Sequence, residues 1–281
     1  EIPESPRPPK LASRHWLSSL AAVPVSLENS PPRPSWGVRL LVDGDDTYST
    51  IEKAMAKAER HLHIEYYIFD PDEVGKRWRD VLAERARAGV KVRVLVDAIG
   101  SSSCTAAFSR PLVHGGEVRQ FNPLRLFQFK APTLNFRTHR KIVVIDGQVG
   151  YTGGINVSKG NSSMSSGSSA WRDTHLEILG PPVIDLQRIF LEDWLYAGQD
   201  NGRKARLDLM KTPADIERWF PRHDPPPAGE PEQGYPWVQI IDSGPDENIP
   251  QIHRFLFSAI TMARFRCWIT TPYFVPDDSI F

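Results

Sequence analysis

Residues 38–97 alternate between short apolar runs and stretches with helical spacing. Ile51, Met55 and Leu62 recur on one helical stripe, and Ser49 with Glu52 forms a capping box that predicts the start of this helix. The predicted elements are a strand at 38–42 that ends at a turn, this helix, a strand at 62–69, a helix at 74–88 and a strand at 90–97. Strand, helix and strand in this order form a unit with parallel strands, so the pattern predicts an α/β fold.

Further along the chain, the pattern predicts a β-hairpin and another helix. Apolar residues at 141–145 and 149–152 flank the turn Asp146-Gly147. Residues 157–170 are rich in Ser and Gly, which predicts a mobile loop. Residues 183–196 have the spacing of an amphipathic helix, which completes the expected unit.

Proline-rich stretches divide the chain. Residues 1–36 contain eight prolines and predict an extended lead-in, and residues 201–236 contain seven and predict a linker. Residues 37–200 between them are expected to form a first repeat. After the linker, an apolar strand, a helical stretch and a second strand at 268–275 return in the same order. Residues 237–281 are therefore expected to be the truncated start of a second repeat.

Composition limits the possible classes of protein. The two cysteines, Cys104 and Cys267, exclude a disulfide scaffold and a Cys-rich zinc site. The sequence has no run of 18 or more apolar residues, so it contains no transmembrane helix. It begins with Glu1 rather than Met and ends inside an apolar stretch at Phe281. We therefore expect a piece of a longer protein.

The formal net charge is zero but is unevenly distributed. Residues 76–141 hold 14 Lys and Arg against 4 Asp and Glu, an excess of +10, and the rest of the chain carries −10. This region indicates either a site for an anionic substrate or surface, or a solvated basic face.

One short segment holds the pattern with the clearest chemistry. His139 and Lys141 lie two positions apart on a predicted strand, so their side chains project from the same face. Asp146 lies at the hairpin turn, and Asn156 follows the pair Gly153-Gly154, which lets the backbone approach a ligand closely. A neutral histidine is a nucleophile, a lysine holds a phosphate oxygen and an asparagine adds a neutral donor. These residues predict phosphoryl chemistry without a metal or other cofactor, since no carboxylate cluster of the magnesium type is nearby in the sequence.

This segment resembles the signature of the phospholipase D superfamily, HxKx4D followed after six residues by G-[GS]-x-N, with Gly154 where many members carry serine. Four other segments resemble the bacterial cardiolipin synthase branch: IEYYIF at 64–69, LVDAIGS at 95–101, WRDTH at 171–175 and TPYFVPDD at 271–278. The resemblance implies a phospholipase D-like α/β/α sandwich with a mixed sheet, with one complete repeat and the start of a second.

The resemblance also implies roles for the motif. His139 is implied to attack phosphorus and form a phosphohistidine, while Lys141, Asn156 and Gly154 bind the phosphate and Asp146 supports the site. In cardiolipin synthases, donor and acceptor are both phosphatidylglycerol, and glycerol leaves. The implied function is therefore a metal-independent phosphatidyltransferase.

Two further carboxylates are candidates for supporting roles. Asp173 matches the family carboxylate that orients the motif histidine. Glu65 lies in a strand that is expected to be mostly buried, so it needs a partner, and it either pairs structurally or faces the cleft.

Family members pair two HxK motifs at one cleft, whereas this chain contains one. From the repeat, a second motif is expected near position ~345, beyond Phe281. The chain is therefore expected to carry half of an active site, which a second repeat or a homodimer partner completes. The implied substrate is an anionic phospholipid of the phosphatidylglycerol type at a membrane surface, either the bacterial inner membrane or its cytoplasmic face.

Other interpretations stay open at this point. The superfamily also contains phospholipase D hydrolases and nucleases, and a chain with one motif is compatible with a non-catalytic lipid-binding module. We expect no nucleic acid partner, because no clear aromatic stacking platform or longer basic stripe is present. Residues 121–137 mix Phe and Leu with Arg and Lys, which indicates either contact with an anionic membrane or a core-packed loop. His61 and His63 have the spacing of a metal pair, but a polar strand edge is favoured, so no metal is expected.

Overall fold

The structure is a computed structural model that describes residues 20–24, 31–123, 137–198, 217, 219–221, 223, 234–243 and 251–271. The chain divides into two compact units, Pro34–Pro236 and Glu1–Arg33 with Trp237–Phe281. The boundaries predicted from the prolines stay predictions, because most residues of the lead-in and the linker lie outside the described ones.

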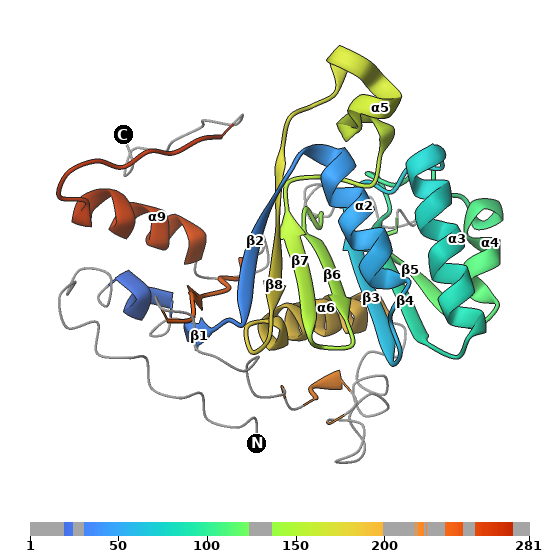
Figure 1. Ribbon diagram of the computed structural model, residues 1–281, viewed down its shortest axis with the longest axis horizontal. Coiled ribbons are helices and arrows are strands. Elements are labelled where there is room, and N and C mark those ends of the chain that lie inside the picture. Colours follow the sequence, from blue (N-terminus) through green and yellow to red (C-terminus); the bar gives the residue numbers. More distant parts are fainter. Residues whose placement is uncertain are drawn as a thin grey trace. The chain divides into compact units, whose positions relative to one another are not determined.

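The unit Pro34–Pro236 alternates strands and helices around one sheet (Figure 1). Its elements are β2 (Gly37–Val42), α2 (Asp43–Met55), β3 (His61–Tyr66), α3 (Glu73–Arg87), β4 (Lys91–Asp97), α4 (Ala106–Val113), β5 (Gly116–Phe121), β6 (Lys141–Ile145), β7 (Val149–Gly153), the 3-10 helix η2 (Lys159–Asn161), α5 (Ser163–Ser166), the 3-10 helix η3 (Gly167–Ser169), β8 (Thr174–Leu179) and α6 (Val183–Ala197). The short strand β1 (Arg33–Pro34) precedes them, and β9 (Trp237–Val238) and α9 (Gln251–Met262) follow.

The main sheet has seven strands in the order β2-β8-β7-β6-β3-β4-β5. β3, β4 and β5 are parallel to one another. β6 is antiparallel to β3, and the pairs β6–β7, β7–β8 and β8–β2 are also antiparallel. The predicted βαβ unit and hairpin are both present, so the mixed sheet is confirmed.

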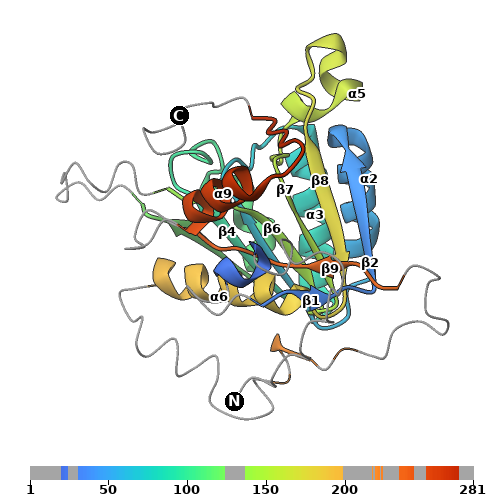
Figure 2. The same ribbon diagram turned by 90° about the vertical axis from the view of Figure 1, so that its left-hand side faces the viewer.

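Helices cover both faces of this sheet. α2, α3 and α4 lie on one face and α6 lies on the other (Figures 1 and 2). Trp78 of α3 and Ile51 of α2 are fully buried in the larger core, and Phe190 and Trp194 of α6 form the second core. The predicted α/β/α sandwich is therefore confirmed, with one apolar core on each face.

The capping box at Ser49 does not start the first helix. α2 begins at Asp43, six residues earlier, and its first turn carries Asp43, Asp45 and Asp46. Carboxylates in the first turn interact favourably with the positive end of the helix dipole. The predicted turn at Asp43-Gly44 is therefore the first turn of the helix.

Residues 157–170 were expected to be a mobile loop, and the structure shows three short helices there instead. The carboxylate of Asp45 accepts hydrogen bonds from the hydroxyl of Ser162 (2.5 Å), from the backbone N–H and hydroxyl of Ser163 (2.9 and 2.6 Å) and from the N–H of Met164 (3.1 Å). One acidic side chain on α2 thus holds the start of α5. The serines that indicated flexibility are its donors.

His61 and His63 were expected at a polar strand edge, but both are fully buried beneath α6. Gln187 of α6 bridges them, with 2.9 Å to Nε2 of His61 and 2.7 Å to Nδ1 of His63. The ring of His63 stacks on Phe190 at 4.5 Å between centroids. The pair is therefore part of the polar contact between the sheet and α6.

Three elements of the seven-stranded sheet and the helices that cover it were missed, and one expected strand is absent where it is described. α4, β5 and β8 have no strong periodic signal in the sequence, and β8 contains the charged and polar residues Glu177 and His175. In the part of the expected strand 268–275 that the structure describes, residues 268–271 have no regular secondary structure. Among the described helices, none combines the length and apolar character needed to cross a lipid bilayer.

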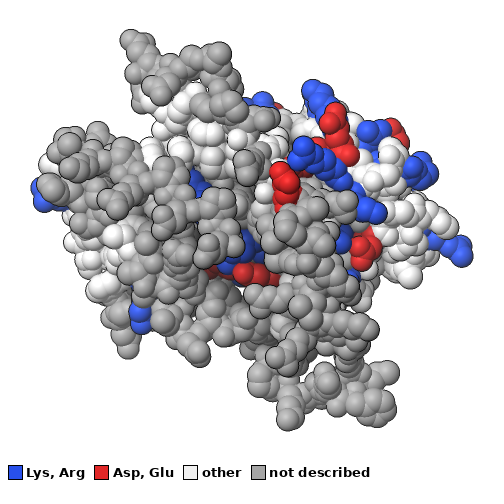
Figure 3. All heavy atoms as spheres, turned by 90° about the horizontal axis from the view of Figure 1, so that it is seen from below, with Lys and Arg blue, Asp and Glu red and all other residues white. Residues whose placement is uncertain are grey.

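The basic region 76–141 is partly neutralised by ion pairs. Arg77 pairs with Glu52 at 3.2 Å, and Arg93 pairs with Glu117 at 3.2 Å. On the face shown in Figure 3, acidic side chains lie among the basic ones.

The buried histidines predict acid sensitivity of the fold. Burial lowers the pKa of His61 to about 4 and lowers the pKa of His63 well below its usual value. The unfolded chain then binds protons near pH 6.5 that the folded chain does not bind, so the free energy of unfolding falls as the pH drops below 6.5. Replacing His63 by Phe removes one such proton and should reduce the slope below pH 6 by about 1.4 kcal/mol per pH unit.

Urea unfolding followed by tryptophan fluorescence at a series of pH values measures this slope. His114→Gln, which replaces an exposed histidine, is the control. If the free energy of unfolding of His63→Phe depends on pH as steeply as that of the unmodified protein, His63 takes up a proton in the folded state and the prediction is wrong.

Candidate functional site

The candidate site lies at the edge of the sheet where β3 and β4 end and β6 begins. β6 runs antiparallel to β3, with Lys141 opposite Tyr66, so the first residue of one strand meets the last residue of the other. β4 is parallel to β3 and ends at the same edge with Asp97. The carboxyl ends of parallel strands are where ligands bind in open α/β sheets.

His139 precedes β6, and its side chain is exposed. Its imidazole stacks on the ring of Tyr67, with 4.1 Å between centroids and 17° between planes. Partial burial and the charge of Lys141 lower its pKa, while Asp97 opposes this shift. The ring is therefore neutral at physiological pH and keeps a fixed orientation, which are the two properties that a nucleophilic histidine needs.

Lys141 lies next to this ring. Its Nζ donates a hydrogen bond to the backbone carbonyl of His139 at 2.7 Å and lies 5.6 Å from the ring centroid of Tyr67. Burial lowers its pKa, and the carboxylate of Asp173 acts in the opposite direction. A cation thus lies within reach of any anionic group that approaches His139.

Asn156 reaches the same edge from the segment after β7. Its Oδ1 accepts a hydrogen bond from the backbone N–H of Ile68 at 3.2 Å, and its own carbonyl accepts from the hydroxyl of Tyr48 at 2.6 Å. The hydrogen bond from Ile68 fixes the orientation of the Asn156 side-chain amide and leaves its Nδ2 group to donate to another acceptor. Asn156 is thereby held beside the residues that follow β3, where Tyr67 supports His139.

Gly154 leaves room for the carboxylate of Asp173 in the position that it has in this structure. A Cβ atom at position 154 would overlap the carboxylate of Asp173. The backbone N–H of Gly154 donates to the carbonyl of Thr174 at 2.9 Å, which fixes the two segments side by side. Between the described side chains of Asp173 and His139 there is no hydrogen bond, and the electrostatic effect of Asp173 falls on Lys141.

Asp146 lies at the other end of β6. Five positions separate it from Lys141, which is about 16 Å along an extended strand. Its Oδ1 accepts from the backbone N–H groups of Arg60 (2.7 Å) and His61 (2.8 Å), and its Oδ2 accepts from that of Glu59 (2.9 Å). The structure thus brings His139, Lys141, Asn156, Gly154 and Asp173 together and separates Asp146, which anchors the entry into β3.

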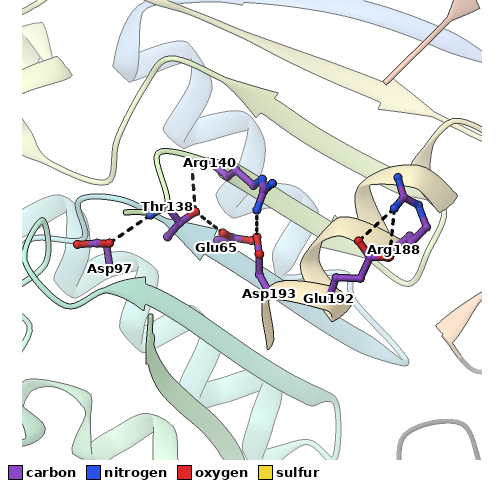
Figure 4. A network of polar contacts seen from close by, with 7 residues as sticks. All are labelled: Glu65, Asp97, Thr138, Arg140, Arg188, Glu192 and Asp193. Atoms are coloured by element: carbon purple, nitrogen blue, oxygen red, sulfur yellow. Dashed lines mark hydrogen bonds and ion pairs between the residues drawn. The ribbon is translucent and has the colours of Figure 1, made fainter. Parts of the chain in front are cut away.

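Figure 4 shows the polar contacts that hold Thr138 and Arg140, the residues on either side of His139. The hydroxyl of Thr138 donates to Oε1 of Glu65 at 2.5 Å, and its backbone N–H donates to Oδ2 of Asp97 at 3.3 Å. Arg140 donates to the carboxylate of Asp193 on α6. Glu65 is thus a structural partner of the motif strand and does not face the cleft.

The electrostatics of this network favour a protonated Glu65. Burial and the neighbouring carboxylate of Asp193 raise its pKa well above the usual value, and Arg140 compensates this only in part. The neutral form of Glu65 is therefore favoured beside the carboxylate of Asp193.

Sequence reasoning missed three residues of this site. Tyr67 and Asp97 enter the sequence analysis only within the segments 64–69 and 95–101, and no pattern in the sequence points to Asp193. The available sequence signal for Asp97 is a carboxylate at the end of an apolar strand. The structure shows it fully buried, where a carboxylate requires partners. In the part of the chain that the structure describes, no group of three His, Cys, Asp or Glu side chains is arranged to hold a metal ion.

Asp146→Ala is expected to lower the free energy of unfolding by about 2 kcal/mol, because three backbone N–H groups lose their acceptor. Asp146→Asn keeps one acceptor oxygen and should lose about half as much. Chemical denaturation measures both. Unchanged stability in Asp146→Ala would contradict the anchoring role.

Glu65→Gln is expected to change stability by less than about 1 kcal/mol, because the amide is neutral like the protonated carboxyl and still accepts from Thr138. Glu65→Ala should cost about 2 kcal/mol or more, since it leaves a cavity and an unpaired hydroxyl. Equal losses in the two variants would mean that Glu65 is ionised and paired with Arg140.

The sequence of the chain was also compared with known proteins. Residues 51–194 match the family described as cardiolipin synthase, PLD-like domain. The chain is 38% identical over 240 residues to cardiolipin synthase 1 of Bacillus cereus, a match that covers 85% of this chain and 45% of that protein. It is 40% identical over 242 residues to cardiolipin synthase of Geobacillus kaustophilus, with 86% and 45% covered. The chain thus spans about half the length of the curated relatives it matches.

Solved structures give a weaker likeness. Nuc, a phospholipase D family member from Salmonella typhimurium, matches with a TM-score of 0.43 and 16% identity, covering 58% of this chain and 94% of Nuc. Phosphatidylserine synthase of Haemophilus influenzae matches with a TM-score of 0.42 and 14% identity, covering 57% and 37%. TM-scores this low say nothing about function, so the family of the chain is assigned from the sequence match alone. From the family match across the sheet and the motif strand, the chain belongs to the phospholipase D superfamily, in the family of cardiolipin synthase PLD-like domains.

Proposed function

We propose that this chain carries one half of the active site of a phosphatidyltransferase of the cardiolipin synthase type. The observation that carries the proposal is the arrangement of His139: its neutral ring is exposed, stacked on Tyr67 and adjacent to the ammonium of Lys141. A neutral imidazole beside a cation suits attack on a phosphodiester, which is anionic and electrophilic at phosphorus.

In the proposed first step, a ring nitrogen of His139 attacks the phosphorus of a phosphatidylglycerol-type lipid. The N–P bond forms while the P–O bond to the departing glycerol breaks, and the glycerol oxygen takes a proton from an acid. Lys141 and the Nδ2 end of Asn156 hold the non-bridging oxygens, where charge develops. The ammonium supplies the compensating charge, so the step is proposed to need no metal.

In the second step, the hydroxyl of a second phosphatidylglycerol attacks the phosphohistidine and releases the His139 nitrogen. The acid of the first step then acts as the base that accepts the hydroxyl proton. We propose that this group is the histidine of a second HxK motif, either in a second repeat or in a second copy of this chain. The order of β9 and α9 after residue 236, which follows that of β2 and α2, supports the interpretation of residues 237–281 as the start of such a repeat.

The proposed substrate is an anionic phospholipid, and the proposed place of reaction is a membrane surface at the bacterial inner membrane or its cytoplasmic face. Two large apolar side chains support this: Met164 is 88% exposed and Trp171 is 74% exposed, both in the segment between Asn156 and Asp173. Apolar side chains at the rim of a site fit a substrate with acyl chains. Most of residues 121–137, for which both membrane contact and packing as a core loop were expected alternatives, lies outside the described residues.

His139→Ala is expected to abolish both the covalent intermediate and turnover, with a loss of about a thousandfold or more, because no other group supplies the nucleophile. The protein is purified from its own cells through a tag on the genomic copy and mixed with vesicles of phosphatidylglycerol labelled with ³²P. Acid-labile, base-stable label on the protein measures the phosphohistidine, and mass spectrometry of the lipids identifies the product.

His114→Ala, which changes an exposed histidine, is the matched control and should retain activity. Cardiolipin and free glycerol as products support transfer, whereas phosphatidic acid indicates hydrolysis. Vesicle binding without any product indicates a non-catalytic lipid-binding module. Full activity in His139→Ala would contradict the proposal.

A further inference from the structure

His175 is a buried polar residue beside the candidate site that the proposed mechanism does not use. Its side chain is 1% exposed, and neither ring nitrogen has a hydrogen-bond partner. Burial and the nearby charge of Lys141 lower its pKa to about 3, so the ring is neutral at physiological pH. A buried imidazole without a partner is costly, so its retention beside a candidate site requires an explanation.

The sheet register places His175 on the same face as Lys141. Gly153 lies directly opposite His175 in the pairing of β7 with β8. Continuing the register of β6 and β7 from the pair Ile142 and Thr152 places Gly153 opposite Lys141. Residues that lie opposite each other across strands share a face, so Lys141 and His175 flank Gly153 at about 10 Å between Cα atoms.

Gly153 leaves the space between them open. A Cβ atom at position 153 would lie 2.7 Å from Nδ1 of His175, so the imidazole occupies the volume that a side chain would fill. Leu41 lies opposite His175 on the other side of β8. The ring therefore extends over the glycine toward β6, on which Lys141 lies.

Lys141 has donor capacity to spare. An ammonium group has three N–H bonds, and the contact that the structure gives Nζ is one hydrogen bond to the carbonyl of His139. A lysine that moves its Nζ onto a phosphate oxygen gives up this carbonyl and needs another acceptor to remain oriented. A neutral imidazole has a nitrogen lone pair that can fill this role.

We propose that His175 is a positioning residue for Lys141: a ring nitrogen of the neutral imidazole accepts a hydrogen bond from Nζ when the ammonium turns from the His139 carbonyl to a bound phosphoryl group. The inference deepens the proposed function and rests on it for the identity of the phosphoryl group. The proximity of Lys141 to a buried and unpartnered imidazole carries it.

The other polar groups around Lys141 do not supply this contact from the same side. Asp173 precedes β8, and Oδ1 of its carboxylate already accepts a hydrogen bond from the backbone N–H of Thr174 at 2.7 Å. Tyr67 presents its ring to Lys141, and the hydroxyl of Tyr48 on α2 is engaged by the carbonyls of Asn156 and Ser158. His139 offers the carbonyl that the lysine leaves.

The test compares His175→Phe, which fills a similar volume without an acceptor, with His175→Gln, which keeps an acceptor oxygen. A hydrogen bond to the ammonium favours its charged form, so losing it lowers the pKa of Lys141. With inorganic phosphate bound at saturation, His175→Phe should therefore lower the pKa of Lys141, measured by NMR of the lysine ¹⁵N signal, and it should weaken phosphate binding by about tenfold. His175→Gln should recover much of both.

A purely structural role predicts a different result. Replacing an unpartnered imidazole by phenyl should leave the urea midpoint unchanged or raised, whereas a structural role requires it to fall. His175→Leu repeats the comparison if the phenyl ring does not fit. A Lys141 pKa and a phosphate affinity that are the same in the folded apolar variant and in the unmodified protein would overturn the inference. Neither readout needs turnover, so absence of transferase activity would contradict the proposed function and leave this result interpretable.

Discussion

The site depends on how the buried polar groups beneath residues 138–140 hold the segment that carries His139, directly before β6. Thr138 is held by Glu65 and Asp97, and Arg140 is held by Asp193 on α6. These contacts are on the face opposite Lys141, in a low-dielectric environment where unpaired polar groups are costly. Residues 138–140 therefore have little freedom to shift. The imidazole on its exposed face can remain stacked on Tyr67 without a hydrogen-bonded carboxylate of its own.

Burial has opposite consequences for the two residues of the motif. It helps to keep His139 neutral and hence nucleophilic. It also lowers the pKa of Lys141, whose proposed role requires the charged form, and the carboxylate of Asp173 acts against this effect. Gly154 permits Asp173 to pack where it does, because any side chain at that position would overlap the carboxylate. The lack of a side chain thus serves packing at both glycines of the motif: Gly153 makes room for His175, and Gly154 makes room for Asp173.

Much of this fold could be predicted from sequence because its central elements have strong periodicity. β3, α3 and β4 form a regular βαβ unit, and the Asp146-Gly147 turn joins β6 and β7 as expected. The roles of Asp146 and Glu65 could not be predicted, since they depend on partners far away in sequence: the backbone of Glu59 to His61 for one, Thr138 and Asp193 for the other. Strand geometry was enough to predict that His139 and Lys141 lie close together. The stacking of Tyr67 on His139 could be seen only in the three-dimensional structure.

The central claim is that His139, Lys141 and Asn156 form one phosphoryl-binding site. A crystal structure of the protein with tungstate, a tetrahedral oxyanion, tests it most directly. The account predicts tungstate within hydrogen-bonding distance of a ring nitrogen of His139, Nζ of Lys141 and Nδ2 of Asn156, with Nζ withdrawn from the His139 carbonyl. Tungstate bound elsewhere, with Lys141 still donating to that carbonyl, would contradict the claim.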